Sequence, residues 1–196
     1  EALARDKNTQ SWQGLGIVIQ AYGKRAPLVI EWVASLARAT QRRICVRLVK
    51  GAYWDAEIKR AQERGLTSYP VFTRKVSTDV SYLACAERLF RYRHVVYPMF
   101  ATHNAHTISA VLELRPPGAK FEFQRLHGMG ALLHDEAKRQ IEGFPRVRAY
   151  ARTRGKPSFC RLASSCNSAP MPCSRWNSNF APGGRNSRTA ARVCAL

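Results

Sequence analysis

Short apolar runs alternate with longer segments of helical periodicity over the first 143 residues. Four runs rich in β-branched and aromatic residues predict strands. Between and after them, apolar residues recur every three to four positions, which predicts helices. The predicted strands are 16–19, 44–49, 95–100 and 121–126, and the predicted helices are 27–40, 55–64, 77–90, 107–114 and 131–141. Strands and helices in alternation favour a parallel sheet built from βα units.

Three of these helices carry further signals for their ends and their buried faces. Pro27 fits the first turn of the helix 27–40, because the N–H groups of a first helical turn have no partner within the helix. Gly65 follows the helix 55–64 and is a suitable C-terminal stop. The expected buried positions are Ile30, Val33, Ala34 and Ala37 in the helix 27–40, and Val80, Leu83, Ala84 and 86–89 in the helix 77–90.

Polar residues gather at or just beyond the C-terminal ends of the predicted strands. They are Gln20, Arg47, Lys50, Thr102, His103, Asn104, Gln124, Arg125 and His127. A (βα)8 barrel carries its active site on this face, and an open doubly wound sheet binds ligands there too, but the sequence has no G-x-G-x-x-G motif. We therefore expect an α/β fold, a partial (βα)8 barrel of four to five βα units with an irregular C-terminal tail.

Composition separates a globular part from a tail. The 196 residues hold 32 Lys and Arg against 13 Asp and Glu, and every acidic residue precedes position 144. Helical periodicity also fades there. We expect a barrel domain at 1–150 and an unstructured basic tail at 151–196. A disordered arm is one interpretation of the tail, but its Cys and Trp content favours an out-of-frame translation of a GC-rich gene.

Charge and cysteine content bear on partners and compartment. A net charge of +19 suggests nucleic acid or an anionic membrane, yet 10 of these charges lie in residues 144–196, which have no recognition motif. No specific nucleic-acid binding is therefore expected. The six cysteines form no CxxC pair, which favours thiols over a metal site or a disulfide framework. No apolar run approaches the roughly 20 residues that cross a bilayer, and no signal peptide is apparent, so a cytoplasmic location is expected. Because the chain starts at Glu, we expect further residues upstream.

The segment 46–55, Val-Arg-Leu-Val-Lys-Gly-Ala-Tyr-Trp-Asp, combines a strand with groups that suit an anionic, planar ligand. Arg47 and Lys50 supply positive charge. Gly51 lets the backbone approach a ligand, and Trp54 offers a stacking face. The alternative is a barrel strand whose cations are solvated and whose Trp belongs to the core.

This segment resembles the signature strand of the proline dehydrogenases, particularly the bifunctional bacterial type that serves proline utilisation. Further segments resemble family motifs in the same order: 16–22 (GIVIQAY), 69–86, 100–107 (FATHNAHT) and 121–130 (FEFQRLHGMG). The segment 146–150 is similar to the last family strand. The resemblance covers about residues 11–142, and five motifs in one order leave little room for chance.

The resemblance implies a distorted barrel that holds FAD and oxidises L-proline to Δ1-pyrroline-5-carboxylate. It implies that electrons pass to a membrane quinone, which places the protein in the cytoplasm at the periphery of the inner membrane. Arg47 is the implied catalytic residue, a fixed cation beside flavin N5 that stabilises the anionic reduced flavin. Gln20 would hydrogen-bond the isoalloxazine, and Leu126 would line the proline pocket. The other implied cofactor contacts are Lys50, Gly51 and Ala52 through their backbone, Trp54 beside the adenine, Thr73, Arg74 and Lys75 near the adenosine and pyrophosphate, and Thr102 and His103 at the flavin.

Each of these residues also has a purely structural interpretation. A Gln or Thr at a barrel rim often satisfies loop backbone, Arg74 and Lys75 can be a solvated face, and Leu126 can be core. His103 and His106 have the spacing of a metal pair, but no suitably spaced carboxylate accompanies them, so no metal site is predicted.

Several family features have no counterpart in the sequence. They are a Lys and an Arg-Arg pair that bind the proline carboxylate, an Asp near the flavin, and the DNA-binding and aldehyde dehydrogenase segments of the bifunctional proteins. We therefore expect weak flavin binding and poor proline oxidation from this chain. The competing functions are a non-catalytic remnant, and a basic tail that binds nucleic acid or an anionic surface.

Overall fold

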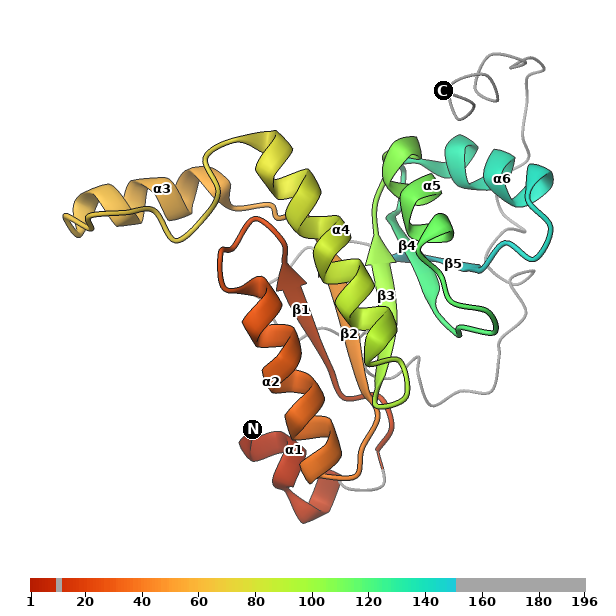
Figure 1. The fold of residues 1–196 in the computed structure, drawn as a ribbon, viewed down its shortest axis with the longest axis horizontal. Helices are drawn as coiled ribbons and strands as arrows, with labels where there is room; N and C mark the ends of the chain where they lie inside the picture. The colour runs from red at the N-terminus through yellow and green to blue at the C-terminus, as the bar shows by residue number, and fades with distance from the viewer. Residues whose placement is uncertain (10–11, 151–196) are drawn as a thin grey trace.

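Five parallel strands form one sheet in the order in which they occur along the chain (Figure 1). The computed structural model describes residues 1–9 and 12–150. The strands are β1 (Gly16–Gln20), β2 (Ile44–Val49), β3 (Val96–Ala101), β4 (Glu122–Leu126) and β5 (Arg146–Tyr150). Each strand pairs in parallel with the next, from Gly16 opposite Cys45 to Leu126 opposite Tyr150. Sequential parallel strands with helical crossovers are the repeating unit of a (βα)8 barrel, so the predicted partial barrel is confirmed.

Helices make every connection between the strands. The segments α1 (Ala2–Arg5) and η1 (Lys7–Thr9) precede the sheet, and α2 (Ala26–Ala39) joins β1 to β2. Two helices, α3 (Trp54–Glu63) and α4 (Lys75–Arg91), lie between β2 and β3. The last crossovers are α5 (Ala105–Glu113) and α6 (Ala131–Gln140). All predicted strands and helices are confirmed, with ends that shift by at most two residues.

The hydrophobic core lies between one face of the sheet and the helices α2, α4 and α5 (Figure 1). Alternate strand residues such as Val46, Leu48 and Phe100 are fully buried on this face. The ring of Phe100 lies 5.1 Å from that of Phe90 and 5.6 Å from that of Phe121, in tilted and edge-on arrangements. Such aromatic pairs add about 0.5–1.5 kcal/mol each to the stabilisation from burial. The side chains of this face therefore fasten the helices to the sheet.

The predicted buried face of α2 is confirmed, but that of α4 is wrong at three positions. Val80 is 64% exposed, and Ala84 and Glu87 are also exposed. Tyr82, by contrast, is fully buried. Ser81 is buried too, because its hydroxyl donates to the backbone oxygen of Ala21 at 2.8 Å. The buried face of α4 thus includes polar and amphipathic side chains. For this reason it does not coincide with the most apolar positions of the sequence.

We call the opposite side of the sheet the inner face. Side chains of successive strand residues point to opposite faces, so the inner face consists of the positions that alternate with the core. Its members used below are Val18, Gln20, Arg47, Met99, Glu122, Gln124, Leu126, Arg148 and Tyr150. Val18 is 49% exposed although it lies within a strand. The inner face is therefore polar and accessible in part, unlike the face that carries the helices.

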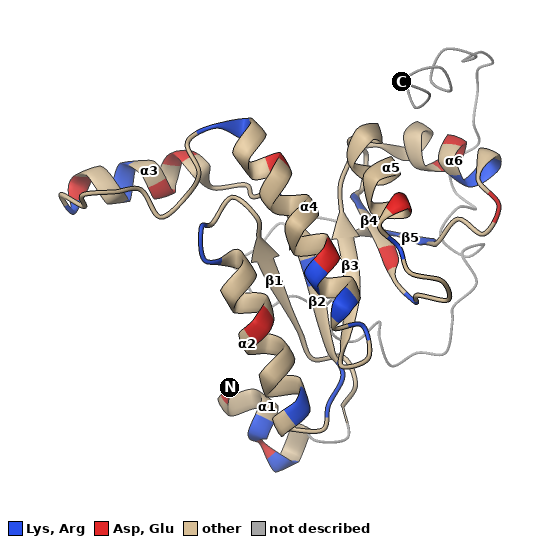
Figure 2. Cartoon of the chain, viewed as in Figure 1, with Lys and Arg blue, Asp and Glu red and all other residues tan. Residues whose placement is uncertain are grey.

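The helix α3 projects from the body of the molecule (Figure 1). Ala61 is its one buried residue, and Figure 2 shows basic and acidic residues along its length. Gly65 follows its end with φ 59°, which confirms the predicted stop. The helix contributes little to the core. Its first residue, Trp54, is the part of the helix that belongs to the candidate site.

The predicted tail, 151–196, and the four cysteines within it lie outside the described residues. Cys45 and Cys85 are buried thiols, as predicted. Among the helices that the structure describes, none has the length and apolar character needed to cross a membrane.

Candidate functional site

Arg47 extends over the inner face from β2 towards β5. The sheet register places it opposite Met99, and its guanidinium carbon lies 3.7 Å from the centre of the Tyr150 ring. A cation held against an aromatic face has a fixed orientation. Its Nε atom is buried and has no hydrogen-bond partner within residues 1–9 and 12–150. Arg47 therefore presents a fixed positive charge and an unused donor. Sequence reasoning gave Tyr150 no role.

The end of β2 lies against the end of β1 through a glycine. Gly51 has φ 134°, and a Cβ atom there would lie 1.4 Å from the ring of Tyr22. The Oε1 atom of Gln20 accepts a hydrogen bond from the backbone N–H of Ala52 at 3.4 Å. The structure thus brings together three predicted cofactor residues, Gln20, Gly51 and Ala52, and only glycine fits the turn.

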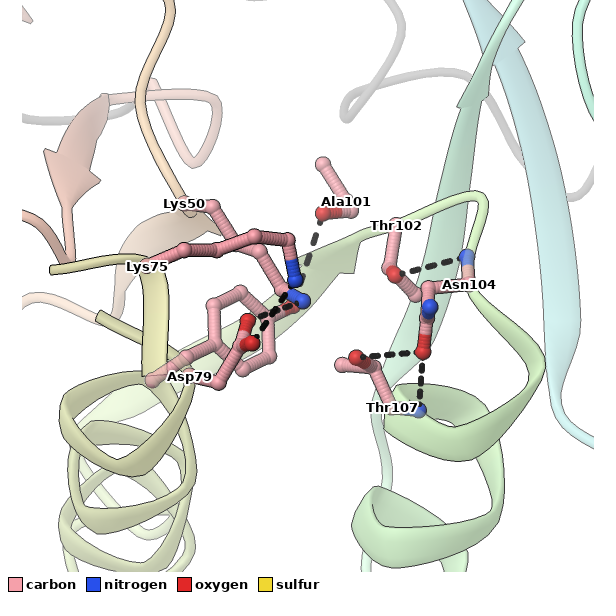
Figure 3. Close-up of polar contacts among 8 residues, drawn as sticks. Lys50, Lys75, Asp79, Ala101, Thr102, Asn104 and Thr107 are labelled. Carbon is pink, nitrogen blue, oxygen red and sulfur yellow. Dashed lines mark hydrogen bonds and ion pairs between the residues drawn. The ribbon is translucent and has the colours of Figure 1, made fainter. Parts of the chain in front are cut away.

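An aspartate that sequence reasoning missed joins two predicted lysines (Figure 3). Asp79 of α4 accepts from Lys50 Nζ at 2.5 Å and from Lys75 Nζ at 2.8 Å. These hydrogen bonds, first from Lys50 and then from Lys75, hold the pKa of Asp79 below its ordinary value. The three side chains carry one net positive charge. The spacing of Lys75 and Asp79, four positions apart on a helix, was the signal available in the sequence.

The predicted adenosine and pyrophosphate residues lie where α3 and α4 begin. Trp54 donates through Nε1 to the backbone oxygen of Phe72 at 2.8 Å and is 40% exposed. Thr73 and Arg74 are exposed, and Arg74 is the residue before the first turn of α4. These residues adjoin Lys75 rather than the end of β3. We call Lys50 and Lys75, which Asp79 joins, the lysine pair.

Thr102 shapes the loop that follows β3, across from the lysine pair in Figure 3. Its hydroxyl oxygen accepts from the backbone N–H of Asn104 at 3.2 Å. Asn104 caps α5, because its Oδ1 atom accepts from the backbone N–H of Thr107 at 2.9 Å. Thr102 is buried, and this contact matches the structural interpretation of a rim threonine that satisfies loop backbone.

His103 connects the end of β3 to the end of β4. Its Nε2 atom accepts from the backbone N–H of Leu126 at 2.9 Å, which places the proton of the neutral ring on Nδ1. Burial, followed by the charges of Arg125 and Arg47, lowers the pKa of His103. Leu126 itself lies on the inner face opposite Tyr150. In the part of the chain that the structure describes, no three His, Cys, Asp or Glu residues are grouped to hold a metal ion.

A buried network on β4 and β5 was also missed. Glu122 is fully buried and binds Arg148 through two contacts, Nε to Oε1 at 2.8 Å and Nη2 to Oε2 at 3.0 Å. Gln124 donates through Nε2 to Glu122 Oε1 at 2.8 Å. Burial, and then the charge of Glu122, raises the pKa of nearby Tyr97 to about 12. The alternation of polar residues along the segments 122–126 and 146–150 was the sequence signal for a polar inner face.

His134 of α6 supports the loop at Thr102 from the core side. It is 1% exposed, and its Nε2 atom donates to the backbone oxygen of Thr102 at 3.1 Å. Burial lowers the pKa of His134 below its ordinary value of 6.5, although the Thr102 contact opposes the shift. The unfolded chain therefore takes up this proton at a higher pH than the folded chain does.

The contribution of His134 to folding stability is accordingly expected to be constant above the unfolded pKa and to fall as the pH drops below about 6.5. The variant His134→Gln can still donate to the Thr102 oxygen and has no charge to gain. Its urea unfolding midpoint should depend less on pH between pH 7.5 and 5 than that of the unaltered chain. The control His106→Gln alters an exposed histidine and should leave the pH dependence unchanged. Equal slopes for both variants would rule out this role for His134.

Comparisons with known proteins agree on one family. The sequence profile described as Proline dehydrogenase matches residues 1–157. The chain is 53% identical over 145 residues to the bifunctional protein PutA of Salmonella typhimurium, and 53% identical over 139 residues to that of Rhizobium meliloti. These matches cover 72% and 69% of the chain, but 11% of each relative, so the chain spans about a tenth of their length.

Solved structures give the same result. A structure of proline utilization A with proline bound in remote sites superposes with a TM-score of 0.71 at 55% identity, covering 76% of this chain and 15% of that one. The Bdellovibrio bacteriovorus protein inactivated by N-propargylglycine gives a TM-score of 0.67 at 34% identity, covering 74% and 15%. On these grounds, and on the strand-end residues described above, the chain belongs to the proline dehydrogenase family of oxidoreductases.

Proposed function

We propose that this chain holds FAD on the inner face of its sheet, as part of an enzyme that oxidises L-proline to Δ1-pyrroline-5-carboxylate. The observation that carries the proposal is Arg47, a cation fixed over Tyr150 whose buried Nε atom has no partner within the described residues. FAD, when bound, supplies the acceptor for a hydride from the ring carbon beside the proline nitrogen, and the C=N bond of the product forms as the nitrogen gives up a proton.

Arg47 is the residue that would respond to the change in flavin charge. A guanidinium stays protonated at any ordinary pH, so it stabilises negative charge by position and takes no part in proton transfer. A charge held in place before the reaction needs no reorganisation during it. Gln20 and Thr102 would contact the same ring system, as would His103, and Leu126 would face the proline.

The lysine pair would bind the other end of the cofactor. Lys50 and Lys75 share one carboxylate and keep one net positive charge, which favours an anion such as a pyrophosphate. Thr73 and Arg74 extend this region, and the exposed ring of Trp54 offers a stacking surface for the adenine. The backbone of Lys50, Gly51 and Ala52 would line the cofactor where no Cβ atom intervenes at Gly51.

The proposal also names a substrate and an electron acceptor for the enzyme of which this chain is part. Proline is supported by the match to the proline dehydrogenase family. A membrane quinone is the proposed acceptor, reached from the cytoplasm at the surface of the inner membrane.

Flavin binding tests the proposal directly. The full chain, titrated with FAD, should quench flavin fluorescence with a measurable dissociation constant. Arg47→Met keeps the length of the side chain but removes its charge and its donor. Because a hydrogen bond to a charged group contributes about 1.5–3 kcal/mol, the dissociation constant should rise roughly 10- to 100-fold.

A matched control is available in α2. Arg38 also lies over a tyrosine, 5.2 Å from the centre of the Tyr92 ring, but it is exposed and lies in the last turn of that helix. Arg38→Met should leave FAD affinity unchanged. The proposal is wrong if the unaltered chain does not bind FAD, or if both arginine variants bind it equally well.

A further inference from the structure

Gln124 is a fully buried glutamine whose amide is only half satisfied. It belongs to β4, next to Phe123, whose ring lies in the hydrophobic core, so its own side chain points to the inner face. Its Nε2 atom donates to Glu122 Oε1 at 2.8 Å and lies 3.1 Å from the sulfur of Met99. Its Oε1 atom is buried and has no partner among residues 1–9 and 12–150.

The neighbours of Gln124 determine which end of its amide is unpaired. Glu122 already binds the Arg148 guanidinium through both oxygens, so it is a carboxylate and can only accept hydrogen bonds. Reversing the Gln124 amide would set its oxygen against this carboxylate. The network thus fixes the amide nitrogen towards Glu122 and leaves the carbonyl oxygen as the unpaired group. The orientation of a glutamine amide is assigned from such hydrogen-bond partners.

A buried carbonyl without a donor is costly, and native proteins rarely keep one without a purpose. Arg47 has the complementary defect, a buried Nε–H without an acceptor in the described part of the chain. Both residues flank Met99, Arg47 by sheet register and Gln124 by contact. The inner face therefore presents one unpaired donor and one unpaired acceptor, which suits a flat ring with C=O and N–H groups on one edge.

The geometry points to Gln124 as a flavin-binding residue whose Oε1 atom accepts the N3–H of the isoalloxazine, an inference that rests on the proposed function. The oxidised ring has a single N–H group, and it lies between two carbonyls on the pyrimidine edge. Gln20 is the other glutamine of the inner face, but its Oε1 atom already accepts from the backbone of Ala52 at 3.4 Å. Gln124 is thus the side chain with an acceptor to offer.

The test compares FAD with 3-methyl-FAD, in which a methyl group replaces the proton on N3. Gln124→Met retains the side-chain length beside Met99 and removes the acceptor, and Arg148 still neutralises Glu122, so the fold should persist and circular dichroism should confirm it. In the full chain this variant should bind FAD about tenfold more weakly than the unaltered protein. It should bind 3-methyl-FAD with unchanged affinity, because that ligand makes no N3 hydrogen bond with either protein.

The same substitution at the other glutamine is the control. Gln20→Met should preserve the preference for FAD over 3-methyl-FAD, even if it weakens both. Loss of the preference in Gln20→Met and its retention in Gln124→Met would overturn the inference and assign N3–H to Gln20. If the unaltered chain binds both flavins equally, the inference alone fails, and if it binds neither, the proposed function fails with it.

Discussion

Replacing Gly51 by alanine is expected to destabilise the fold by about 2–6 kcal/mol, the sum of backbone strain and overpacking. The new Cβ atom would lie 1.4 Å from the ring of Tyr22 at a backbone φ of 134°. Tyr22 cannot withdraw easily, because its backbone N–H donates to the Lys50 oxygen at 2.9 Å and its oxygen accepts from the Phe72 N–H at 2.8 Å. The end of β2 would therefore have to move.

Gly65→Ala separates the two causes. Gly65 also has a positive φ, 59°, but an added Cβ would meet nothing within 4 Å. This variant should lose only about 1–2 kcal/mol, the cost of the left-handed conformation. Urea unfolding followed by circular dichroism measures both. If Gly51→Ala is as stable as Gly65→Ala, the contact with Tyr22 carries no energetic weight. FAD affinity should fall in Gly51→Ala, because the backbone of 50–52 would be displaced.

The order and type of the strands and helices could be predicted because each is encoded locally. The core residues of α2 recur at helical spacing, and the apolar run of β2 is bounded by polar residues, so short windows of sequence sufficed. The face of α4 could not be predicted in this way. Its core stripe includes Ser81, whose burial depends on a backbone oxygen 60 residues away in the loop after β1.

The candidate site likewise has residues that a local motif predicts and contacts that depend on distant parts of the chain. Arg47, Lys50 and Gly51 lie in one continuous motif, so a resemblance to a family could single them out. The contact between Arg47 and Tyr150 joins β2 to β5, and it depends on the register and curvature of the intervening strands, which no local pattern reports. Asp79 was within reach of prediction, since its spacing from Lys75 places both on one helix face.

Burial itself was the property least visible in the sequence. Glu122 precedes Phe123 in what could be an ordinary amphipathic strand, and a charged residue there predicts a solvent-facing side chain. The structure makes it fully buried. Its partner Arg148 lies 26 residues further along the chain, and the register of β4 against β5 brings the two together. A polar residue in a strand thus identifies the inner face but not its degree of solvation.

Breaking the ion pair between Glu122 and Arg148 is also expected to lower the free energy of unfolding strongly. Glu122→Leu leaves the guanidinium of Arg148, which is 15% exposed, without its carboxylate and removes the acceptor of the Gln124 amide. Losing one partner of a buried pair costs about 3–5 kcal/mol, because the remaining charge stays in a poorly solvated place. That is a large share of the roughly 5–15 kcal/mol that typically separates folded from unfolded states.

The double variant Glu122→Leu with Arg148→Met removes both charges and should recover most of the loss, since an apolar pair of similar volume often replaces a buried ion pair at little cost. As a surface control, Glu87→Leu breaks the exposed pair with Arg91 and should cost less than about 1 kcal/mol. Unfolding free energies in urea give all three values. A double variant no more stable than Glu122→Leu would show that the damage comes from lost packing or from Gln124, and not from the charge of Arg148. Recovery would show that the single variant is destabilised by the uncompensated charge in a poorly solvated place, and that the backbone pairing of β4 with β5 and apolar packing suffice to keep β5, and with it Tyr150, beneath Arg47.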